Sequence, residues 1–293
     1  MFKSGFVNIV GRPNVGKSTL VNALVGENVS ITTFKPQTTR HRILGIINEA
    51  DYQIVLSDTP GYVHDPAYRM HEKMNSFVMT SFEDADIMIL VTDMDDQYDK
   101  EHRLIQKLNA LSCPLFLVIN KVDLLEDDAI LLLIRKWQGL LSFKECIPLS
   151  ALHGANVEKL LALIRENLPE GPAYFPEDQL SDRTERFFVS EIIREQIFLQ
   201  YREEVPYSCD VSVESFKDEE SIVRIEAYIF VNRKTQKSIL IGKGGQAIKK
   251  LGTEARLKIE SFLDKKVFLQ LLVKVRENWR DNDQLLDKLG YRG

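Results

Sequence analysis

Short apolar runs alternate with amphipathic stretches over the first 168 residues of the chain. Five of these runs are FVNIV, IVLS, IMILVT, LFLVIN and CIPLS, and helical patterns such as residues 129–141 and 157–168 lie in the spaces. Continuous apolar runs separated by helices are typical of parallel strands that are covered on both faces. The pattern predicts an α/β domain with a doubly wound sheet.

A proline-rich stretch interrupts this alternation. Leu168 to Gln179, LPEGPAYFPEDQ, contains three prolines and one glycine and has no helical or strand period. Such a stretch is typical of a linker. We therefore expect a first domain over residues 1–168, a linker over residues 169–182 and a second domain over residues 183–293.

The second domain has a different hydrophobic period. Residues 184–201 have a helical pattern, whereas residues 223–231, residues 267–275 and the stretch around Val211 alternate between apolar and polar positions. Between the last two alternating runs, residues 248–262 carry an apolar side chain every three or four positions, as on the buried side of a helix. This order predicts an α+β domain with a one-sided sheet of about three strands.

Composition indicates a globular protein of the cell interior. Of the 293 residues, 44% are hydrophobic and 28% are charged. The longest uncharged run, residues 108–120, is shorter than the roughly 20 apolar residues of a membrane-spanning helix. The amino terminus leaves no room for a signal peptide, so we expect the mature protein to begin at Met1. Cys113, Cys146 and Cys209 sit beside apolar residues, which favours free buried thiols in a reducing compartment.

The net charge of −5 is unevenly distributed along the chain. Residues 233–276 contain 12 Lys or Arg and 3 Asp or Glu, so this segment carries +9 and the rest of the chain carries −14. A small basic module on an acidic body favours nucleic acid or anionic lipid as the partner of that module.

The stretch GRPNVGKS, residues 11–18, lies between the first apolar run and a helical pattern. It matches G-x-x-x-x-G-K-[ST] in the strand, loop and helix context that this motif needs. Glycines let backbone N–H groups curl around phosphates at a helix N-terminus. Lys17 would reach the β- and γ-phosphates, and the Ser18 hydroxyl would bind Mg²⁺. The expected nucleotide contacts are Gly11, Asn14, Val15, Gly16, Lys17, Ser18 and Thr19.

Three further polar motifs follow apolar runs. They are DTPG at residues 58–61, NKVD at residues 120–123 and SAL at residues 150–152. Because the carboxyl ends of parallel strands meet at one edge of a sheet, where ligands bind, we expect all three motifs to lie beside the phosphate loop. Asp58 is the expected carboxylate partner of Mg²⁺, acting through water.

Together the four motifs resemble the nucleotide-binding set of the translation-factor class of GTPases. The resemblance implies that Asp123 accepts two hydrogen bonds from guanine, one of them from an exocyclic amine that adenine lacks. It also implies that two NKVD side chains brace and cover the base and that the SAL backbone meets the guanine oxygen. The expected base contacts are Asn120, Lys121, Asp123, Ser150, Ala151 and Leu152. A metabolic kinase with the same phosphate loop would prefer ATP and would have no use for NKVD.

Residues 35–42, KPQTTRHR, lie where this class of GTPases has its first switch segment. By similarity we choose Thr39 as a further hydroxyl ligand of Mg²⁺, with Thr38 as the alternative. The expected catalytic set is then Lys17, Thr39 and Gly61, and the expected metal ligands are Ser18, Thr39 and Asp58.

Two positions bear on the rate of hydrolysis. Tyr62 stands where Ras-like members have the glutamine that orients the attacking water, and a phenol is a poor base at neutral pH. We therefore expect slow intrinsic turnover. Phosphate loops of the form PNVGKS resemble those of GTPases that bind K⁺ against the transferring phosphate, so Asn14 adds K⁺ to the expected ions.

The second domain carries the stretch ILIGKGGQAIKK, residues 239–250, just before its amphipathic helix. The order α, β, β, G-x-x-G, α, β resembles a KH domain of the bacterial arrangement, type II, whose loop clamps about four single-stranded nucleotides. The resemblance predicts RNA contacts from Gly242, Lys243, Gly244, Gly245, Lys249, Lys250 and Lys258.

A doubly wound α/β P-loop GTPase domain followed by an α+β KH domain resembles the Era family of bacterial ribosome-assembly GTPases over nearly the whole chain. Residues 175–195 also resemble the junction between the two domains of that family. The resemblance implies GTP or GDP with Mg²⁺, binding to the single-stranded 3′ end of small-subunit ribosomal RNA, and a role in maturation of the small ribosomal subunit. We expect a cytoplasmic monomer, with peripheral contact at the cytoplasmic face of the inner membrane as a further possibility.

A membrane-surface GTPase whose basic domain docks on anionic lipid is the alternative. Lipid docking favours a basic amphipathic helix with large apolar groups on its other face, whereas these lysines cluster around a glycine loop. The roles of Trp279 and Tyr291 stay open between base stacking and packing.

Overall fold

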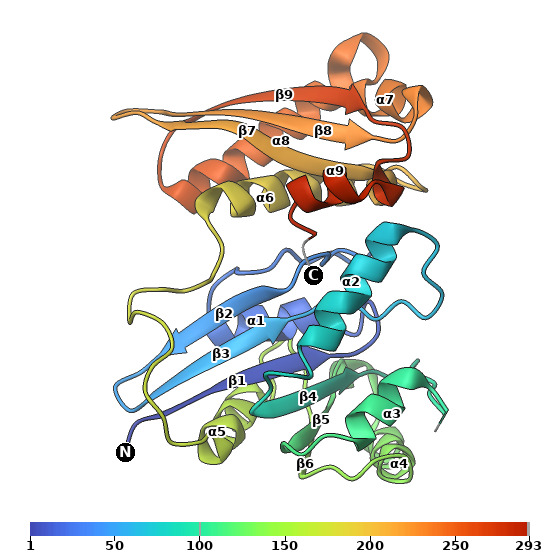
Figure 1. The fold of residues 1–293 in the computed structure, drawn as a ribbon, viewed down its shortest axis with the longest axis vertical. Coiled ribbons are helices and arrows are strands. Elements are labelled where there is room, and N and C mark those ends of the chain that lie inside the picture. Colours follow the sequence, from blue (N-terminus) through green and yellow to red (C-terminus); the bar gives the residue numbers. More distant parts are fainter. Residues whose placement is uncertain (100, 292–293) are drawn as a thin grey trace. The chain divides into compact units, whose positions relative to one another are not determined.

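The computed structural model describes residues 1–99 and 101–291 (Figure 1). Their contacts divide the chain into two compact units. The first unit takes in Met1–Pro66 and His71–Asp182, and the second begins at Arg183 and includes Ala67–Met70. Within the described ranges, no helix combines the length and apolar character needed to cross a membrane.

The first unit is built on a six-stranded sheet in the order β2-β3-β1-β4-β5-β6. The five strands expected from the apolar runs are parallel to one another. The sixth, β2, was missed; it pairs antiparallel with β3 at the edge, so the sheet is mixed rather than purely parallel. The strands are β1 (Lys3–Val10), β2 (Ile43–Asn48), β3 (Tyr52–Asp58), β4 (Ile87–Thr92), β5 (Leu115–Ile119) and β6 (Glu145–Pro148).

Helices cover both faces of this sheet, which confirms the doubly wound arrangement. Because side chains alternate across a strand, neighbouring residues of β1 enter different cores. Ile9 packs in one cluster with Leu20 and Leu160, and Val10 packs in another with Leu104 and Trp137. The helices are α1 (Lys17–Val25), α2 (Arg69–Thr80), α3 (Arg103–Asn109), α4 (Asp127–Gln138) and α5 (Val157–Asn167).

The proline-rich segment of residues 169–182 is hydrogen-bonded to the edge of the sheet in the first unit. The Gln53 Oε1 atom accepts hydrogen bonds from the backbone N–H groups of Tyr174 and Phe175 at 2.7 and 3.0 Å. The Leu44 N–H group donates to the Asp182 carboxylate at 2.9 Å. The segment expected as a linker therefore forms hydrogen bonds with β2 and β3.

The second unit has the predicted three-stranded sheet, in the order β7-β8-β9, with helices packed on one face. Strand β8 is antiparallel to β7 and parallel to β9. Helix α7 was not expected, because its eight residues follow β8 almost directly and end at the G-x-x-G stretch. The elements are α6 (Glu185–Gln200), β7 (Cys209–Asp218), β8 (Val223–Val231), α7 (Lys234–Ile241), α8 (Gln246–Leu263), β9 (Val267–Val275) and α9 (Asp283–Lys288).

The two aromatic residues near the carboxyl end are packed inside this unit. Trp279 and Tyr291 are both fully buried. The Trp279 indole N–H donates to the Ser208 carbonyl at 3.0 Å, and the Tyr291 hydroxyl donates to the Asp210 carboxylate at 2.6 Å. Packing, not base stacking, is therefore their role in this structure.

Candidate nucleotide site and G-x-x-G loop

The phosphate loop connects β1 to the first residue of α1. Gly11 and Gly16 have positive φ angles of 151° and 96°. A Cβ atom at Gly16 would lie 2.1 Å from the Asn120 amide nitrogen, and one at Gly11 would lie 2.2 Å from the Val91 carbonyl. Glycine is therefore required at both positions by backbone conformation and by close neighbours.

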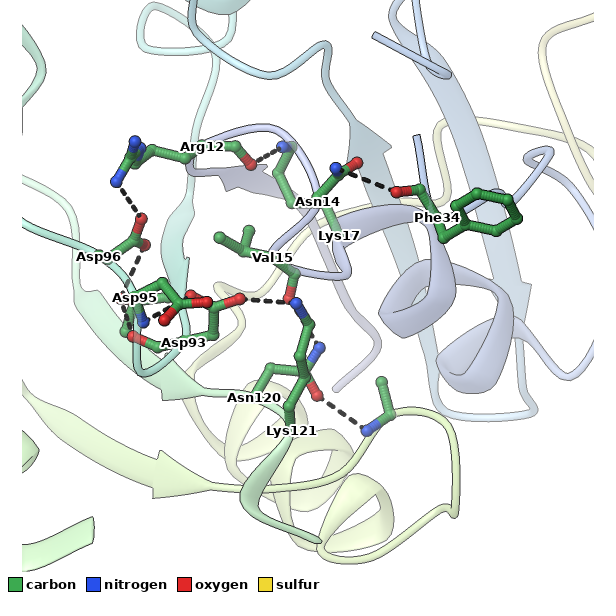
Figure 2. Close-up of polar contacts among 12 residues, drawn as sticks. Arg12, Asn14, Val15, Lys17, Phe34, Asp93, Asp95, Asp96, Asn120 and Lys121 are labelled. Atoms are coloured by element: carbon green, nitrogen blue, oxygen red, sulfur yellow. Dashed lines mark hydrogen bonds and ion pairs between the residues drawn. The ribbon is translucent and has the colours of Figure 1, made fainter. Parts of the chain in front are cut away.

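Lys17 begins α1 and is buried under the loop. Its ammonium donates to the carbonyl oxygens of Gly11 and Arg12 at 3.0 and 2.8 Å (Figure 2). Burial lowers the pKa of Lys17 to about 8, although the charges of Asp58 and Asp96 oppose the shift. The free site thus holds a cation that is close to losing its proton.

We expect GTP affinity to fall as the pH rises past about 8, because the free protein then loses the positive charge of Lys17. Below that pH the ammonium is present and affinity should level off. Titration of a fluorescent GTP analogue between pH 6.5 and 9.5 measures this directly. Constant affinity up to pH 9.5 would contradict the assignment of Lys17 to the phosphates.

Three oxygen-bearing side chains meet beside Lys17. The hydroxyl oxygens of Ser18 and Thr39 lie 2.7 Å apart, and the Thr39 hydroxyl lies 3.5 Å from the Asp58 carboxylate. Burial raises the pKa of Asp58, while hydrogen bonding from Ser18 and the charge of Lys17 lower it. Thr38 instead hydrogen-bonds to Thr33 and to the Lys35 carbonyl, so of the two threonines the structure brings Thr39 to this cluster.

These oxygens fit a small divalent cation. The Asp58 Oδ1 atom is buried and has no hydrogen-bond partner among the described residues. Mg²⁺ takes hydroxyl, carboxylate and phosphate oxygens, often through water. The three side chains could therefore hold Mg²⁺ together with the phosphates of a nucleotide.

Asn120 joins three of the sequence motifs. Its side-chain amide donates to the Val15 carbonyl at 2.8 Å, and its side-chain oxygen accepts the Ala151 N–H at 3.0 Å (Figure 2). The phosphate loop, NKVD and SAL are thus held at one edge of the sheet by a single side chain.

The remaining NKVD residues flank this connection. Lys121 has a φ angle of 63° and pairs with Asp93 at 2.6 Å. Asp123 is exposed, and the Ser150 hydroxyl is the main cause that lowers the pKa of its carboxylate. The His153 ring lies 3.7 Å from that carboxylate.

Several neighbours of the site were not found from the sequence. Asp93 directly follows the apolar run IMILVT at the same sheet edge, which was a usable signal, whereas His153 has no distinctive spacing. Asp96 pairs with Arg12 of the phosphate loop at 3.2 Å. Leu152, predicted to lie by the base, is largely exposed.

The DTPG segment and the residue before the first switch segment each contact the phosphate loop. Gly61 packs against Pro13 so closely that a Cβ atom would lie 2.6 Å from the proline nitrogen. The Asn14 side-chain amide donates to the Phe34 carbonyl at 3.2 Å, which links the phosphate loop to the residue directly before the first switch segment (Figure 2).

The G-x-x-G loop lies at the N-terminus of α8. Gly242, Gly244 and Gly245 have φ angles of 70°, 60° and 78°, and a Cβ atom at Gly242 would lie 2.6 Å from that of Ala247. The loop thus needs its glycines. Lys243, Lys249 and Lys250 are exposed around it.

Lys258 is set apart from this group. It pairs with Glu195 on α6 at 2.8 Å. It also lies eight residues beyond Lys250, about 12 Å farther along the helix. The structure therefore does not bring Lys258 together with the other predicted RNA contacts.

Known proteins are similar to the chain in both units. A family model described as 50S ribosome-binding GTPase matches residues 6–121, and a KH domain model matches residues 204–280. The GTPase Era of Geobacter metallireducens is 46% identical over 293 residues, which cover 99% of this chain and 98% of the relative.

Two solved structures of Era match the full length of the chain. The crystal structure of a point variant of Aquifex aeolicus Era bound to GDP.AlF4- is 36% identical with a TM-score of 0.94. A crystal structure of Era in complex with MgGDPNP and nucleotides 1506-1542 of 16S ribosomal RNA is 37% identical with the same TM-score. In both comparisons the match covers 100% of this chain and 100% of the chain in the solved structure.

Proposed function

The chain belongs to the Era family of GTPases and is itself a GTPase. We propose that it couples its GTP state to RNA binding during assembly of the small ribosomal subunit. The RNA that we propose as partner is the single-stranded 3′ end of small-subunit ribosomal RNA. An Era structure holds nucleotides 1506-1542 of 16S ribosomal RNA, which supports this choice. The exposed lysines around a glycine loop at a helix start support it independently.

The observation that carries the nucleotide site is the position of Asn120 between the phosphate loop and SAL. In our proposal Lys17 binds the β- and γ-phosphates, Asp123 accepts hydrogen bonds from guanine, and the Ala151 N–H faces the guanine oxygen. Ser18, Thr39 and Asp58 would hold Mg²⁺, which when bound neutralises phosphate charge. Gly61 offers its backbone beside the phosphate loop.

GTP would act as a switch through contacts that GDP lacks. The γ-phosphate would keep Thr39 beside Ser18 and keep Gly61 on the phosphate loop, whereas loss of that phosphate would free both segments. Binding of RNA by the KH domain would then depend on the nucleotide, provided that RNA has different affinities for the two states.

Charge reversal in the G-x-x-G loop tests the RNA proposal. We expect Lys243→Asp to weaken binding of a short single-stranded RNA by roughly tenfold or more. The dependence of the logarithm of the binding constant on the logarithm of the salt concentration should also become shallower, by about one phosphate contact. Lys266→Asp is the control, because Lys266 lies in the same basic segment but beyond the far end of α8. If both variants bind the RNA as tightly as the parent in a fluorescence anisotropy titration, the KH loop does not bind RNA.

Hydrolysis should be slow in sodium buffer and faster in potassium buffer. The Tyr62 ring is buried in the core and cannot orient water at the phosphates. The Asn14 amide nitrogen donates to the Phe34 carbonyl at 3.2 Å, which holds this side chain at the phosphate loop, where its amide oxygen would be the K⁺ ligand. Phosphate release should therefore rise with K⁺ in the parent but not in Asn14→Ala. Equal rates of phosphate release by the parent in the two buffers would contradict the proposed K⁺ site.

We propose a cytoplasmic monomer for the free protein, because two domains with an acidic body need no dimer. Peripheral contact with the inner membrane is the alternative, and flotation with anionic vesicles in the presence and absence of competing RNA separates the two proposals.

A further inference from the structure

A cluster of rings lies directly after Gly61, in the segment that we call the second switch loop (residues 58–66). The Tyr62 ring meets the His102 ring edge-on, with centroids 5.8 Å apart and planes at 73°. The His64 ring stacks on His102 at 5.3 Å with planes at 24°. One histidine from outside the switch loop thus contacts two of its side chains.

His102 is itself held in place from the other side. Its Nδ1 atom accepts the Leu104 N–H at 3.2 Å and so caps α3. The Tyr98 ring packs edge-on against it at 4.6 Å, and Tyr98 in turn packs at 5.5 Å against Trp137, which is fully buried. Tyr98 therefore connects His102 to the buried Trp137, while His102 contacts the switch loop.

The hydrogen bond of the cap also fixes the chemical form of His102. An Nδ1 atom that accepts a hydrogen bond carries no proton, so the ring is neutral with its proton on Nε2. Protonation would remove the acceptor. It would also place a positive charge beside the stacked His64 ring.

We propose that His102 is a positioning residue for GTP hydrolysis: its neutral ring clamps Tyr62 and His64, and thereby keeps Gly61 packed on the phosphate loop. Tyr62 follows Gly61 directly, and Gly61 has no space to move toward Pro13. Release of the Tyr62 ring would therefore let the backbone next to the γ-phosphate shift. This inference rests on the proposed function, because it assumes that GTP is hydrolysed at the phosphate loop.

The surroundings of His102 set the pH at which the clamp would open. Burial lowers the pKa of His102, the His64 and Arg12 charges lower it further, and Asp99 opposes the shift. The phenol of Tyr98 has its pKa raised by burial and stays neutral. Since the pKa of His102 is lowered, the clamp is intact at neutral pH and is lost as the pH falls through that lowered value. The titratable and charged groups that face His102 are Tyr62 and His64 of the switch loop, Tyr98 and Asp99 of the preceding loop, and Arg12 of the phosphate loop.

Two substitutions separate the cap from the ring. His102→Asn keeps a residue that caps helices well but removes the ring, and His102→Phe keeps a ring but cannot cap or take up a proton. We expect His102→Asn to lower kcat at pH 7.5 by roughly tenfold or more, as for a small misplacement near reacting groups, with unchanged GTP affinity. His102→Phe should retain more of the rate and lose the decline of kcat at acid pH.

The measurement is kcat of the full chain between pH 5 and 8, with GTP affinity measured in parallel and folding checked by thermal melting. The parent should decline with a midpoint below the ordinary histidine value of about 6.5, and His64→Phe, which keeps a stacking ring, should decline in the same way. A parent-like decline in His102→Phe, or parent-like kcat in His102→Asn, would overturn the inference while leaving GTP hydrolysis in place. Absence of hydrolysis in the parent would overturn the proposed function and the inference with it.

Discussion

Lys17→Ala should reduce GTP hydrolysis by roughly a hundred- to a thousandfold, the usual loss when one preorganised group that stabilises transition-state charge is removed. Lys17 is buried beneath the phosphate loop and is held by the carbonyl oxygens of Gly11 and Arg12. The γ-phosphate would replace these partners and meet the ammonium in a site sheltered from water. Since charge grows on the phosphoryl oxygens during transfer, the loss should appear in kcat as well as in affinity.

Single-turnover phosphate release at saturating GTP measures this effect. Lys107→Ala is the control, because Lys107 is an exposed residue of α3 with no place in the site. A Lys17→Ala variant that hydrolyses GTP within a few-fold of the control would show that the phosphates bind elsewhere.

Asp123→Asn should weaken GTP binding by roughly a hundred- to ten-thousandfold, because two hydrogen bonds to a charged acceptor contribute about 1.5–3 kcal/mol each. The carboxylate is ionised at neutral pH, since the Ser150 hydroxyl lowers its pKa. Asparagine presents a donor amide where the guanine amine needs an acceptor. The same amide can donate to a carbonyl, so the variant should gain affinity for xanthosine triphosphate, which carries a carbonyl in place of that amine.

Competition of GTP and xanthosine triphosphate for the variant gives the readout. Asp127→Asn is a matched control, because Asp127 is an exposed carboxylate in the first turn of α4. If Asp123→Asn keeps the GTP affinity of the parent, the carboxylate does not contact the base.

The fold was predictable where the hydrophobic pattern was strong. Fully buried strands such as β4 and β5 produce continuous apolar runs, which are a strong signal in the sequence. The edge strand β2 has one side half-exposed and follows a basic switch segment, so its six residues gave no separate signal. Helix α7 was hidden for a similar reason, because it is short and lies between a strand and a glycine loop without a break in composition.

The candidate site was predictable where its parts are contiguous. The phosphate loop, DTPG, NKVD and SAL each present their chemistry within a few neighbouring residues, and parallel strands deliver them to one edge. The choice between Thr38 and Thr39 needed coordinates, because adjacent residues of a loop have no periodicity that fixes their directions. His102 could not be found at all, since its partners in the switch loop lie far earlier in the chain and belong to a different element.

The central claim is that Asp123 selects the purine whose phosphates Lys17 holds. Calorimetric titration of the full chain with GTP and with ATP, both with Mg²⁺ at neutral pH, tests it most directly. We predict that GTP binds at least roughly a hundredfold more tightly than ATP, because adenine would leave the carboxylate without its amine donor. Equal affinities for the two nucleotides would contradict the account.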